Sequence, residues 1–343
     1  MTRPRVLYTD PPWLIDGSRI DEALATVEAE VLGDRAEVLF GPFADGRYQL
    51  TGEAMLERVR DTQVVVVYRC QVTEDLLDAA GKQLVAVVRQ GVGVDNLNAV
   101  LLAGRRLLAY NVPDYCVDEV SSHTTALALA LERAVLPQHL SLVGGRFDIY
   151  AGGTPRRTSR RALGIVGFGR IGRAVARKLG PHYGQVIVYD PYLGRDLAEG
   201  YGGRAVDTLE ELLGAADLVS LHCPLTSETR HLIDRRALGL MRDGAYLVNA
   251  ARGALIDPVA LGEALDGGRL AGAGLDVFSP ENPHDDPAWK PVLRHPAVVV
   301  TSHRAYLSSD AEASSRRRVA ELVRSVLDGA TPVVGRVPGE EGI

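Results

Sequence analysis

The chain has 343 residues, of which 46% are hydrophobic and 24% are charged, and its formal net charge is −6. This composition is typical of a globular protein, and the length favours two domains over one. The negative charge argues against a general nucleic-acid binder. No apolar run reaches the roughly 20 residues that a membrane-spanning helix needs, and the N-terminus lacks the apolar region of a signal peptide. We therefore expect a cytoplasmic protein that contacts neither nucleic acid nor membrane.

The three cysteines, Cys70, Cys116 and Cys223, lie far apart in the sequence. Their spacing fits neither a metal site nor a disulfide framework, so we expect no bound metal. Cys223 has no activating neighbour in the sequence, which favours a packing role over a nucleophilic one.

Strands and helices alternate along the first third of the chain. Apolar runs predict strands at residues 6–8, 37–40, 63–68, 84–89 and 107–110. A helix is predicted from about residue 19 to residue 31, and Thr73 is the predicted N-cap of another helix. A long amphipathic helix is then expected over residues 117–136. It carries His123, for which we predict a domain contact, and the apolar stretch 126–131, which fits either a subunit interface or ordinary packing.

The alternation continues through the second half of the chain. Strands are predicted at residues 163–166, 186–189, 217–221, 245–248, 272–276 and 297–301, and helices at 173–179 and 311–328. This pattern predicts an α/β fold with two doubly wound parallel-sheet domains and an interdomain cleft. We assign residues 112–306 to a Rossmann domain. Residues 1–111 and 307–343 form the predicted substrate domain, which is discontinuous and flavodoxin-like.

A glycine pattern between a predicted strand and a predicted helix indicates a dinucleotide site. Gly167 permits a tight turn, Gly169 lets a pyrophosphate approach the backbone, and Gly172 lets the helix pack on the strand. Arg170 and Ile171 stand at the helix N-terminus, where unpaired N–H groups favour an anion. The order of strand, glycines, helix, strand and acid is far more specific than the glycines alone. We therefore predict that these five residues contact the cofactor.

The acid that completes this pattern is Asp190, which lies 18 residues after Gly172 at the end of the next strand. A carboxylate at this position binds the ribose 2′-hydroxyl of NAD and repels the 2′-phosphate of NADP. No arginine follows until Arg195. The sequence therefore favours NAD over NADP.

Three titratable residues follow three late strands. Arg252, Glu281 and His303 each come shortly after an apolar run. The carboxyl ends of parallel strands meet at one edge of a sheet, so we expect the three side chains at the edge where the nicotinamide must lie.

The chain resembles the D-isomer-specific 2-hydroxyacid dehydrogenases, a family that includes phosphoglycerate dehydrogenases and the C-terminal-binding-protein corepressors. Six blocks carry the resemblance, which as a whole extends from about residue 60 to residue 325. These blocks are residues 91–96, 163–172, 221–226, 249–253, 274–281 and 302–303. Their order and spacing are more specific than any single motif.

The resemblance implies a catalytic role for Arg252, Glu281 and His303 in the interconversion of a 2-hydroxy acid and a 2-keto acid. The Arg252 guanidinium matches a carboxylate and the neighbouring C2 oxygen. His303 would take the hydroxyl proton during oxidation and return it during reduction. Glu281 would orient the imidazole and favour its charged form.

The resemblance also implies further contacts. The N–H groups of Val92 and Gly93 would bind the substrate carboxylate, although Gly91 and Gly93 would equally serve a simple turn. Asp276 would face the nicotinamide carboxamide or cap a neighbouring turn. The remaining cofactor contacts implied are His222, Cys223, Pro224, Thr229, Asn249 and Ala250.

The chain departs from the family pattern around the histidine and the acid. Asn282 follows Glu281, where the family usually has proline, and Ser302 precedes His303, where proline is again common. Arg304 adds a second cation beside the histidine, and Arg69 ends a strand of the first domain. We therefore hypothesise a substrate with a phosphate, phosphonate or second carboxylate group; the alternative is that Arg304 points to solvent or pairs with an acid.

Two other functions fit the same scaffold. One is an NAD(H)-sensing interaction protein like the corepressors, and the other is a dehydrogenase of a phosphorus oxyacid such as phosphite. Relatives pair two nucleotide domains, so the resemblance implies a homodimer. The leading prediction is an NAD-dependent enzyme that acts on a small anionic substrate.

Overall fold

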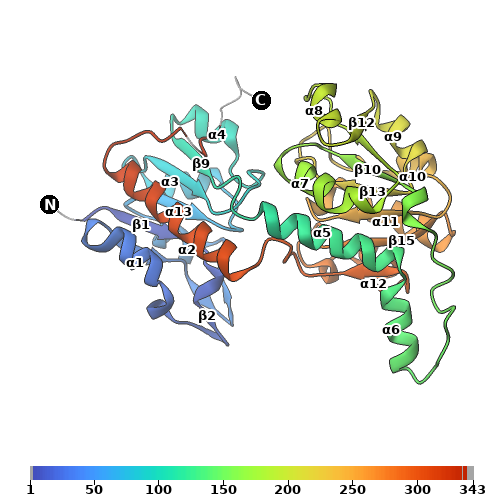
Figure 1. Cartoon of the computed structure of the whole chain (residues 1–343). Helices are drawn as coiled ribbons and strands as arrows, with labels where there is room; N and C mark the ends of the chain where they lie inside the picture. Colours follow the sequence, from blue (N-terminus) through green and yellow to red (C-terminus); the bar gives the residue numbers. More distant parts are fainter. Residues whose placement is uncertain (1–2, 334, 338–343) are drawn as a thin grey trace. The chain divides into compact units, whose positions relative to one another are not determined.

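The computed structural model describes residues 3–333 and 335–337. The chain divides into two compact units, one formed by residues 1–115 and 308–343 and the other by residues 116–307 (Figure 1). Each unit is built on a parallel sheet with helices on both faces, as the sequence predicts. Within the described ranges, no helix has both the length and the apolar character that crossing a bilayer requires.

The first unit contains a five-stranded parallel sheet. Its strand order along the chain is 2-1-3-4-5, the flavodoxin-like order, with the switch point between its first and third strands. From edge to edge the strands are β4 (Glu37–Phe40), β1 (Arg5–Tyr8), β7 (Thr62–Val67), β8 (Ala86–Arg89) and β9 (Leu108–Asn111). Two small hairpins flank the sheet, β2 (Ile15–Asp16) with β3 (Arg19–Ile20) and β5 (Phe43–Ala44) with β6 (Arg47–Tyr48).

Alternate strand residues of the first unit point to opposite faces of the sheet, and each face packs on its own helices. Val6 and Tyr8 face α1 (Thr26–Leu32) and α13 (Ser309–Leu327), which lie side by side (Figure 1). Leu7 faces the opposite layer, which consists of α2 (Glu53–Arg58), α3 (Glu74–Ala80) and α4 (Ala99–Gly104). The period-2 pattern of the strands therefore produces two hydrophobic layers.

The second unit contains a seven-stranded parallel sheet with strand order 3-2-1-4-5-6-7, which is the Rossmann order with one added strand. From edge to edge the strands are β12 (Gly203–Ala205), β11 (Gln185–Tyr189), β10 (Ala162–Val166), β13 (Leu218–Leu221), β14 (Ala245–Asn249), β15 (Leu270–Leu275) and β16 (Val298–Val300). The topological switch point lies between β10 and β13.

Helices cover both faces of this sheet. One layer contains α5 (Val117–Glu132), α7 (Arg170–Leu179) and α8 (Arg195–Glu199). The other contains α9 (Leu209–Ala215), α10 (Arg235–Leu240), α11 (Pro258–Asp266) and α12 (Lys290–Arg294). The apolar stretch 126–131 of α5 packs in its own unit, because Leu127, Ala128 and Leu131 are buried against the sheet.

Two predicted helices have different bounds. The helix expected from residue 19 begins only at Thr26, because Arg19 and Ile20 pair with Asp16 and Ile15 in a hairpin instead. The helix expected over residues 117–136 ends at Glu132, since Ala134 adopts the left-handed conformation with φ 50°. A separate helix, α6 (Val135–Val143), then begins. This restart places Pro137 in a first turn, where its missing N–H costs no helical hydrogen bond.

The amino ends of the strands in the second unit carry a buried ionic cluster. Arg161 Nη1 lies 3.3 Å from Glu132 Oε2, and Arg161 Nη2 donates to the Asp217 carbonyl at 2.8 Å. Tyr183 donates its hydroxyl to Glu132 Oε1 at 2.8 Å, and the Arg161 guanidinium lies 5.1 Å from the centroid of the Tyr246 ring. Burial raises the pKa of Glu132. The cluster ties the end of α5 to the first residues of the central strands.

A second buried ion pair joins α1 to α13 in the first unit, and an exposed pair beside it provides a matched control. Arg316 binds both Glu28 oxygens, at 3.1 and 2.7 Å, whereas Arg317 binds the exposed carboxylate of Glu30. The Glu28 side chain is 0% exposed and the Glu30 side chain 62% exposed. Removal of a buried partner leaves an uncompensated charge, whereas an exposed carboxylate is rehydrated.

We expect Arg316→Met to lower the free energy of unfolding by about 3 to 5 kcal/mol. Arg317→Met should leave it nearly unchanged, because water replaces the lost partner. Urea titration of both variants followed by circular dichroism measures the difference. Equal effects of the two changes would contradict the role assigned to burial.

Candidate active site

The three fingerprint glycines have the three geometries that a dinucleotide loop needs. Gly167 has φ +87°, and a β-carbon there would lie 2.5 Å from the Cys223 backbone nitrogen. A β-carbon on Gly172 would lie 2.2 Å from the Gly167 carbonyl oxygen, so the helix can approach the strand only with glycine. A β-carbon on Gly169 would meet nothing within 4 Å. The space above Gly169 is therefore open for a ligand.

The N-terminus of α7 faces this opening without a side-chain cap. The helix begins at Arg170, three residues earlier than predicted, so Arg170, Ile171 and Gly172 form its first turn. Gly169 is the N-cap residue and has no side chain to cap the helix, which leaves the first N–H groups to a phosphate. The residues present therefore fit the pyrophosphate of a dinucleotide.

Asp190 joins the end of β11 to the glycine loop. Its Oδ2 accepts the Phe168 N–H at 2.7 Å, and its Oδ1 accepts the Tyr192 N–H at 3.0 Å. A pocket of about 350 Å³ lies beside it, lined among others by Pro191, Val206 and Asp207. The carboxylate thus stands at the carboxyl ends of the strands, where the sequence places the ribose contact.

The segment after β13 packs directly against the glycine loop. His222 donates its backbone N–H to the Val166 carbonyl at 2.7 Å, and its Nε2 lies 2.8 Å from Ser220 Oγ. Burial lowers the pKa of His222 to about 4 and raises the pKa of the Cys223 thiol to about 11. Both side chains are therefore neutral at pH 7, which favours a packing role for Cys223. Cofactor contacts of His222, Cys223 and Pro224 stay predictions.

Thr229 closes the same segment on itself. Its hydroxyl donates to the Pro224 carbonyl at 2.7 Å and accepts the Thr226 N–H at 2.8 Å. These bonds shape the loop, and the predicted contact of Thr229 with a dinucleotide stays a prediction.

Asn249 braces the turn that carries Arg252 at the end of β14. Its side chain accepts the Ala251 N–H at 3.0 Å and donates to the Arg252 carbonyl at 2.9 Å. Asn249 is fully buried, while Ala250 and Arg252 are partly exposed. The amide of Asn249 therefore shapes the arginine turn, and the cofactor contacts predicted for Asn249 and Ala250 stay predictions.

Gly253 brings this turn against the segment that follows β15. A β-carbon on Gly253 would lie 2.0 Å from the Phe278 carbonyl carbon, so only glycine fits. Further along, Trp289 donates Nε1–H to the Ser279 carbonyl at 3.0 Å and packs edge-on against Phe278. Two backbone segments are thus held in contact, one carrying Arg252 and the other carrying Glu281.

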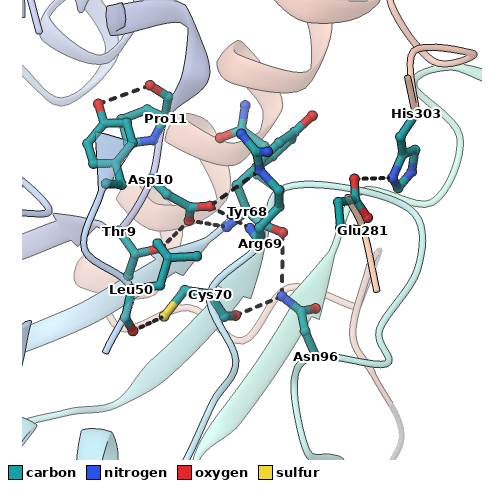
Figure 2. A network of polar contacts seen from close by, with 12 residues as sticks. Thr9, Asp10, Pro11, Leu50, Tyr68, Arg69, Cys70, Asn96, Glu281 and His303 are labelled. Atoms are coloured by element: carbon teal, nitrogen blue, oxygen red, sulfur yellow. Dashed lines mark hydrogen bonds and ion pairs between the residues drawn. The ribbon is translucent and has the colours of Figure 1, made fainter. Parts of the chain in front are cut away.

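Glu281 and His303 form a direct hydrogen-bonded pair. Glu281 Oε1 lies 2.7 Å from His303 Nδ1 (Figure 2). Both side chains reach solvent, with the His303 side chain 33% and the Glu281 side chain 50% exposed. A carboxylate oxygen accepts, so His303 must carry a proton on Nδ1 in this arrangement. Nε2 is the remaining ring nitrogen and makes no hydrogen bond to any residue that the structure describes.

Asp276 holds the turn that presents His303. Its Oδ1 accepts the Arg304 N–H at 3.0 Å and its Oδ2 accepts the Ala305 N–H at 2.9 Å, while its carbonyl accepts the His303 N–H at 2.7 Å. His303 has φ 50°, a conformation that costs a non-glycine residue about 1 to 3 kcal/mol. Asp276 therefore caps a turn, one of its two predicted roles, and its contact with the carboxamide stays a prediction.

Arg69 stands at the carboxyl edge of the sheet in the first unit, next to the switch point between β1 and β7. The buried Asp10 carboxylate accepts the Tyr68 and Arg69 N–H groups at 3.1 and 2.8 Å (Figure 2). The Arg69 side chain is 52% exposed. Arg89, at the end of β8, lies 5.3 Å from the centroid of the Tyr68 ring, and Arg69 lies 5.7 Å from it. Two cations therefore flank one aromatic ring.

The predicted anion contacts Val92 and Gly93 follow Arg89 on the same edge. Asn111 Nδ2 donates to the Val92 carbonyl at 2.7 Å, and Val112 N–H donates to the Gly91 carbonyl. Neither Val92 N–H nor Gly93 N–H donates to another residue within 3–333 and 335–337. Successive N–H groups of this kind can bind a carboxylate.

Sequence reasoning missed three residues that shape these two edges. The sequence does indicate a position at a strand end for Asp10 and Arg89, because both follow apolar runs, as Arg69 does. For His123 the sequence predicts a domain contact, which stays a prediction; the structure shows a contact within the second unit, with Nε2 2.9 Å from Thr301 Oγ1. The partner of His123 is 178 residues away in sequence, and no local pattern indicates it.

A Rossmann-ordered sheet with an open glycine cradle and a carboxylate–imidazole pair at its carboxyl edge defines a dinucleotide-binding protein of the doubly wound α/β class. Residues 125–305 match the family model described as D-isomer specific 2-hydroxyacid dehydrogenase, NAD binding domain. The chain therefore belongs to the D-isomer specific 2-hydroxyacid dehydrogenase family, and NAD is the cofactor of its second unit.

Curated relatives and solved structures agree with this assignment. The chain is 37% identical over 287 residues to D-3-phosphoglycerate dehydrogenase of Methanocaldococcus jannaschii, which covers 82% of this chain and 52% of the relative. It is 34% identical over 331 residues to the enzyme of the same name from Mycobacterium tuberculosis, at 94% and 60% coverage. The chain thus spans little more than half the length of these relatives.

Among solved structures, D-lactate dehydrogenase from Aquifex aeolicus, complexed with NAD and lactic acid, superposes with a TM-score of 0.83. It is 26% identical and covers 94% of this chain and 96% of its own. The TT0316 protein from Thermus thermophilus is 31% identical, with a TM-score of 0.77 and coverage of 97% and 100%.

Two alanine variants separate the open space above Gly169 from the packed contact at Gly172. We expect Gly169→Ala to fold normally and to raise the Kd for NAD at least about tenfold, because its methyl group enters the pyrophosphate space. Gly172→Ala should lower both stability and NAD affinity, since its methyl group meets the Gly167 carbonyl. Calorimetric NAD titration and thermal unfolding check both expectations. Unchanged NAD affinity in the folded Gly169→Ala variant would show that the cofactor lies elsewhere.

Proposed function

We propose that this protein is an NAD-dependent dehydrogenase that interconverts a small anionic D-2-hydroxy acid and its 2-keto acid. The observation that carries the proposal is the 2.7 Å pair of Glu281 and His303, positioned at the carboxyl edge of an NAD-binding sheet. Family membership and the names of the relatives support the reaction class. The domain roles predicted from the sequence, with NAD in the second unit and substrate recognition in the first, are part of the same proposal.

His303 is the proposed acid–base group. Its Nδ1 is held by Glu281, so Nε2 is left to accept the proton of the substrate hydroxyl during oxidation and to return it during reduction. The Glu281 carboxylate stabilises the imidazolium that forms when Nε2 takes the proton. Bound NAD supplies the hydride acceptor in this reaction.

Arg252 is the proposed anchor of the substrate carboxylate. A guanidinium stays charged at every pH that an enzyme meets and offers two parallel N–H donors to a carboxylate. Asn249 and Gly253 hold its turn beside the segment that leads to Glu281. In the first unit, the N–H groups of Val92 and Gly93, which donate to none of the described residues, support a second contact to a carboxylate.

A second anionic group on the substrate is the finer part of the proposal. Arg69 and Arg89 flank Tyr68 in the first unit, and Arg304 follows His303 in the second. The Arg304 side chain is exposed, and its backbone N–H is held by Asp276. Relatives named D-3-phosphoglycerate dehydrogenase support a phosphate-bearing acid.

A homodimer is also proposed, through an apolar surface on α6 and the segment after it. We call this surface the α6 arm; its exposed side chains are Leu140, Leu142, Val143, Phe147, Ile149 and Tyr150. The arm extends away from the sheet of the second unit (Figure 1). Side chains such as Phe147, 89% exposed, seldom stay in water when they occur together. A second copy of the same arm is the proposed partner.

The reaction is tested with a panel of 2-hydroxy acids, phosphorylated hydroxy acids, phosphonates and phosphite, each with NAD and with NADP. We expect NADH formation with an anionic 2-hydroxy acid, a preference for NAD because of Asp190, and the highest kcat/KM with a phosphorylated acid. Glu281→Gln should lower kcat about 10- to 100-fold. Asp285→Asn makes the same charge change in the same loop and should leave kcat unaltered.

Each other outcome selects a different function. Turnover of phosphite alone would favour the phosphorus oxyacid reaction. NAD binding without turnover in either direction, tested also with keto acids and NADH, would favour the interaction protein. Equal kcat/KM for lactate-like and phosphorylated acids would remove the second anion from the proposal.

The dimer is tested by light scattering after size exclusion. We expect twice the mass of the chain for the wild type, and a monomer for the double variant Val143→Glu with Phe147→Glu, because carboxylates in the contact lose water without gaining partners. Val259→Glu changes an exposed valine of α11 outside the arm and should leave the dimer intact. A wild type with the mass of one chain would refute the dimer.

A further inference from the structure

A chain of side-chain hydrogen bonds connects α5 to the turn that presents His303. His123 Nε2 lies 2.9 Å from Thr301 Oγ1, and Thr301 Oγ1 lies 2.5 Å from Asp276 Oδ1. Asp276 in turn accepts the N–H groups of His303, through its carbonyl, and of Arg304 and Ala305. The series therefore runs from a helix of the second unit into the backbone of the proposed acid–base residue.

The direction of each proton in the series follows from the groups themselves. A hydroxyl has one hydrogen, and a carboxylate only accepts, so Thr301 donates to Asp276. The Thr301 oxygen must then accept from His123, which requires a proton on His123 Nε2. His123 Nε2 also lies 3.6 Å from Asp276 Oδ1. The His123 side chain is 22% exposed, so it is mostly buried.

We propose that His123 is a positioning residue for His303. It fixes the Thr301 hydroxyl, which fixes one oxygen of the Asp276 carboxylate, and that carboxylate holds the strained turn at residues 303–305. Without the His123 donor, the Thr301 hydroxyl can rotate away from Asp276, and the turn loses one of its constraints. His303 then spends less time against Glu281. The role in catalysis rests on the proposed function, whereas the hydrogen-bond series itself does not.

The tautomers of the ring nitrogens test the series without any turnover. In protein labelled with ¹⁵N-histidine, we expect Nε2–H for His123 and Nδ1–H for His303 in long-range ¹⁵N–¹H spectra. His123→Leu, which keeps the volume and removes the donor, should reduce the Nδ1–H population of His303. His123→Gln keeps an N–H donor and should restore it. Thr301→Val should act like His123→Leu, and the two changes together should have no larger effect than either alone.

Activity is the second readout. With the substrate found in the panel, His123→Leu should lower kcat about tenfold or more through misplacement of His303, with little change in the KM for NAD. His123→Gln should retain most of kcat. Ser122→Ala removes an exposed contact with Lys178 from the adjacent position of α5 and should leave kcat and the His303 signals unchanged.

Several results would overturn the inference. An Nδ1–H population of His303 that is the same in His123→Leu and wild type would do so, as would equal damage from the glutamine and leucine variants. If the protein turns over no substrate, the proposed function fails, but the tautomer measurements still decide whether His123 positions His303.

Discussion

The buried carboxylate of Asp276 is the constraint on which the candidate site depends. The carboxylate accepts two backbone N–H groups and a hydroxyl. The backbone carbonyl of Asp276 accepts the N–H of His303. These bonds hold His303 at φ 50°, a backbone conformation that a histidine seldom adopts by itself. The turn that brings the imidazole to Glu281 is thus held by an acceptor at the end of a neighbouring strand. A hydrogen-bonded pair needs this kind of support, since a loose ring would lose its partner for much of the time.

At the same edge of the sheet, backbone segments come into direct contact at two positions where only glycine fits. Gly167 lies against Cys223, and Gly253 lies against Phe278. The first contact shapes the cofactor loop, and the second brings the arginine turn next to the segment of the acid. In each case the two segments follow two neighbouring parallel strands, whose carboxyl ends lie side by side at this edge. The Rossmann order therefore explains why residues from distant parts of the sequence reach one edge.

Much of the fold and of the cofactor loop could be predicted from the sequence, because the patterns that indicate them are local. The glycine fingerprint, the strands and the position of Asp190 each depend on a few consecutive residues, and the strand order of both sheets agrees with the predicted classes. The sequence prediction lacks the break of the long helix at Ala134, although Pro137 would have interrupted the hydrogen bonds of a continuous helix. The partners of Asp276 and His123 could not be found, because they come from another strand end far away in sequence. The catalytic roles of Arg252, Glu281 and His303 remain predictions that rest on family membership and geometry.

Helix α5 is held at both of its ends by buried polar contacts. Glu132, in its last turn, binds Arg161 at the amino edge of the sheet, while His123, in its second turn, binds Thr301 at the carboxyl edge. The two residues are nine positions apart in the helix, a span of about 14 Å along its axis. A helix fastened in this way cannot slide or rotate over the sheet without breaking a contact at one end. Loosening of the Glu132 contact at the amino edge of the sheet would therefore also displace His123 at the carboxyl edge, where His303 lies.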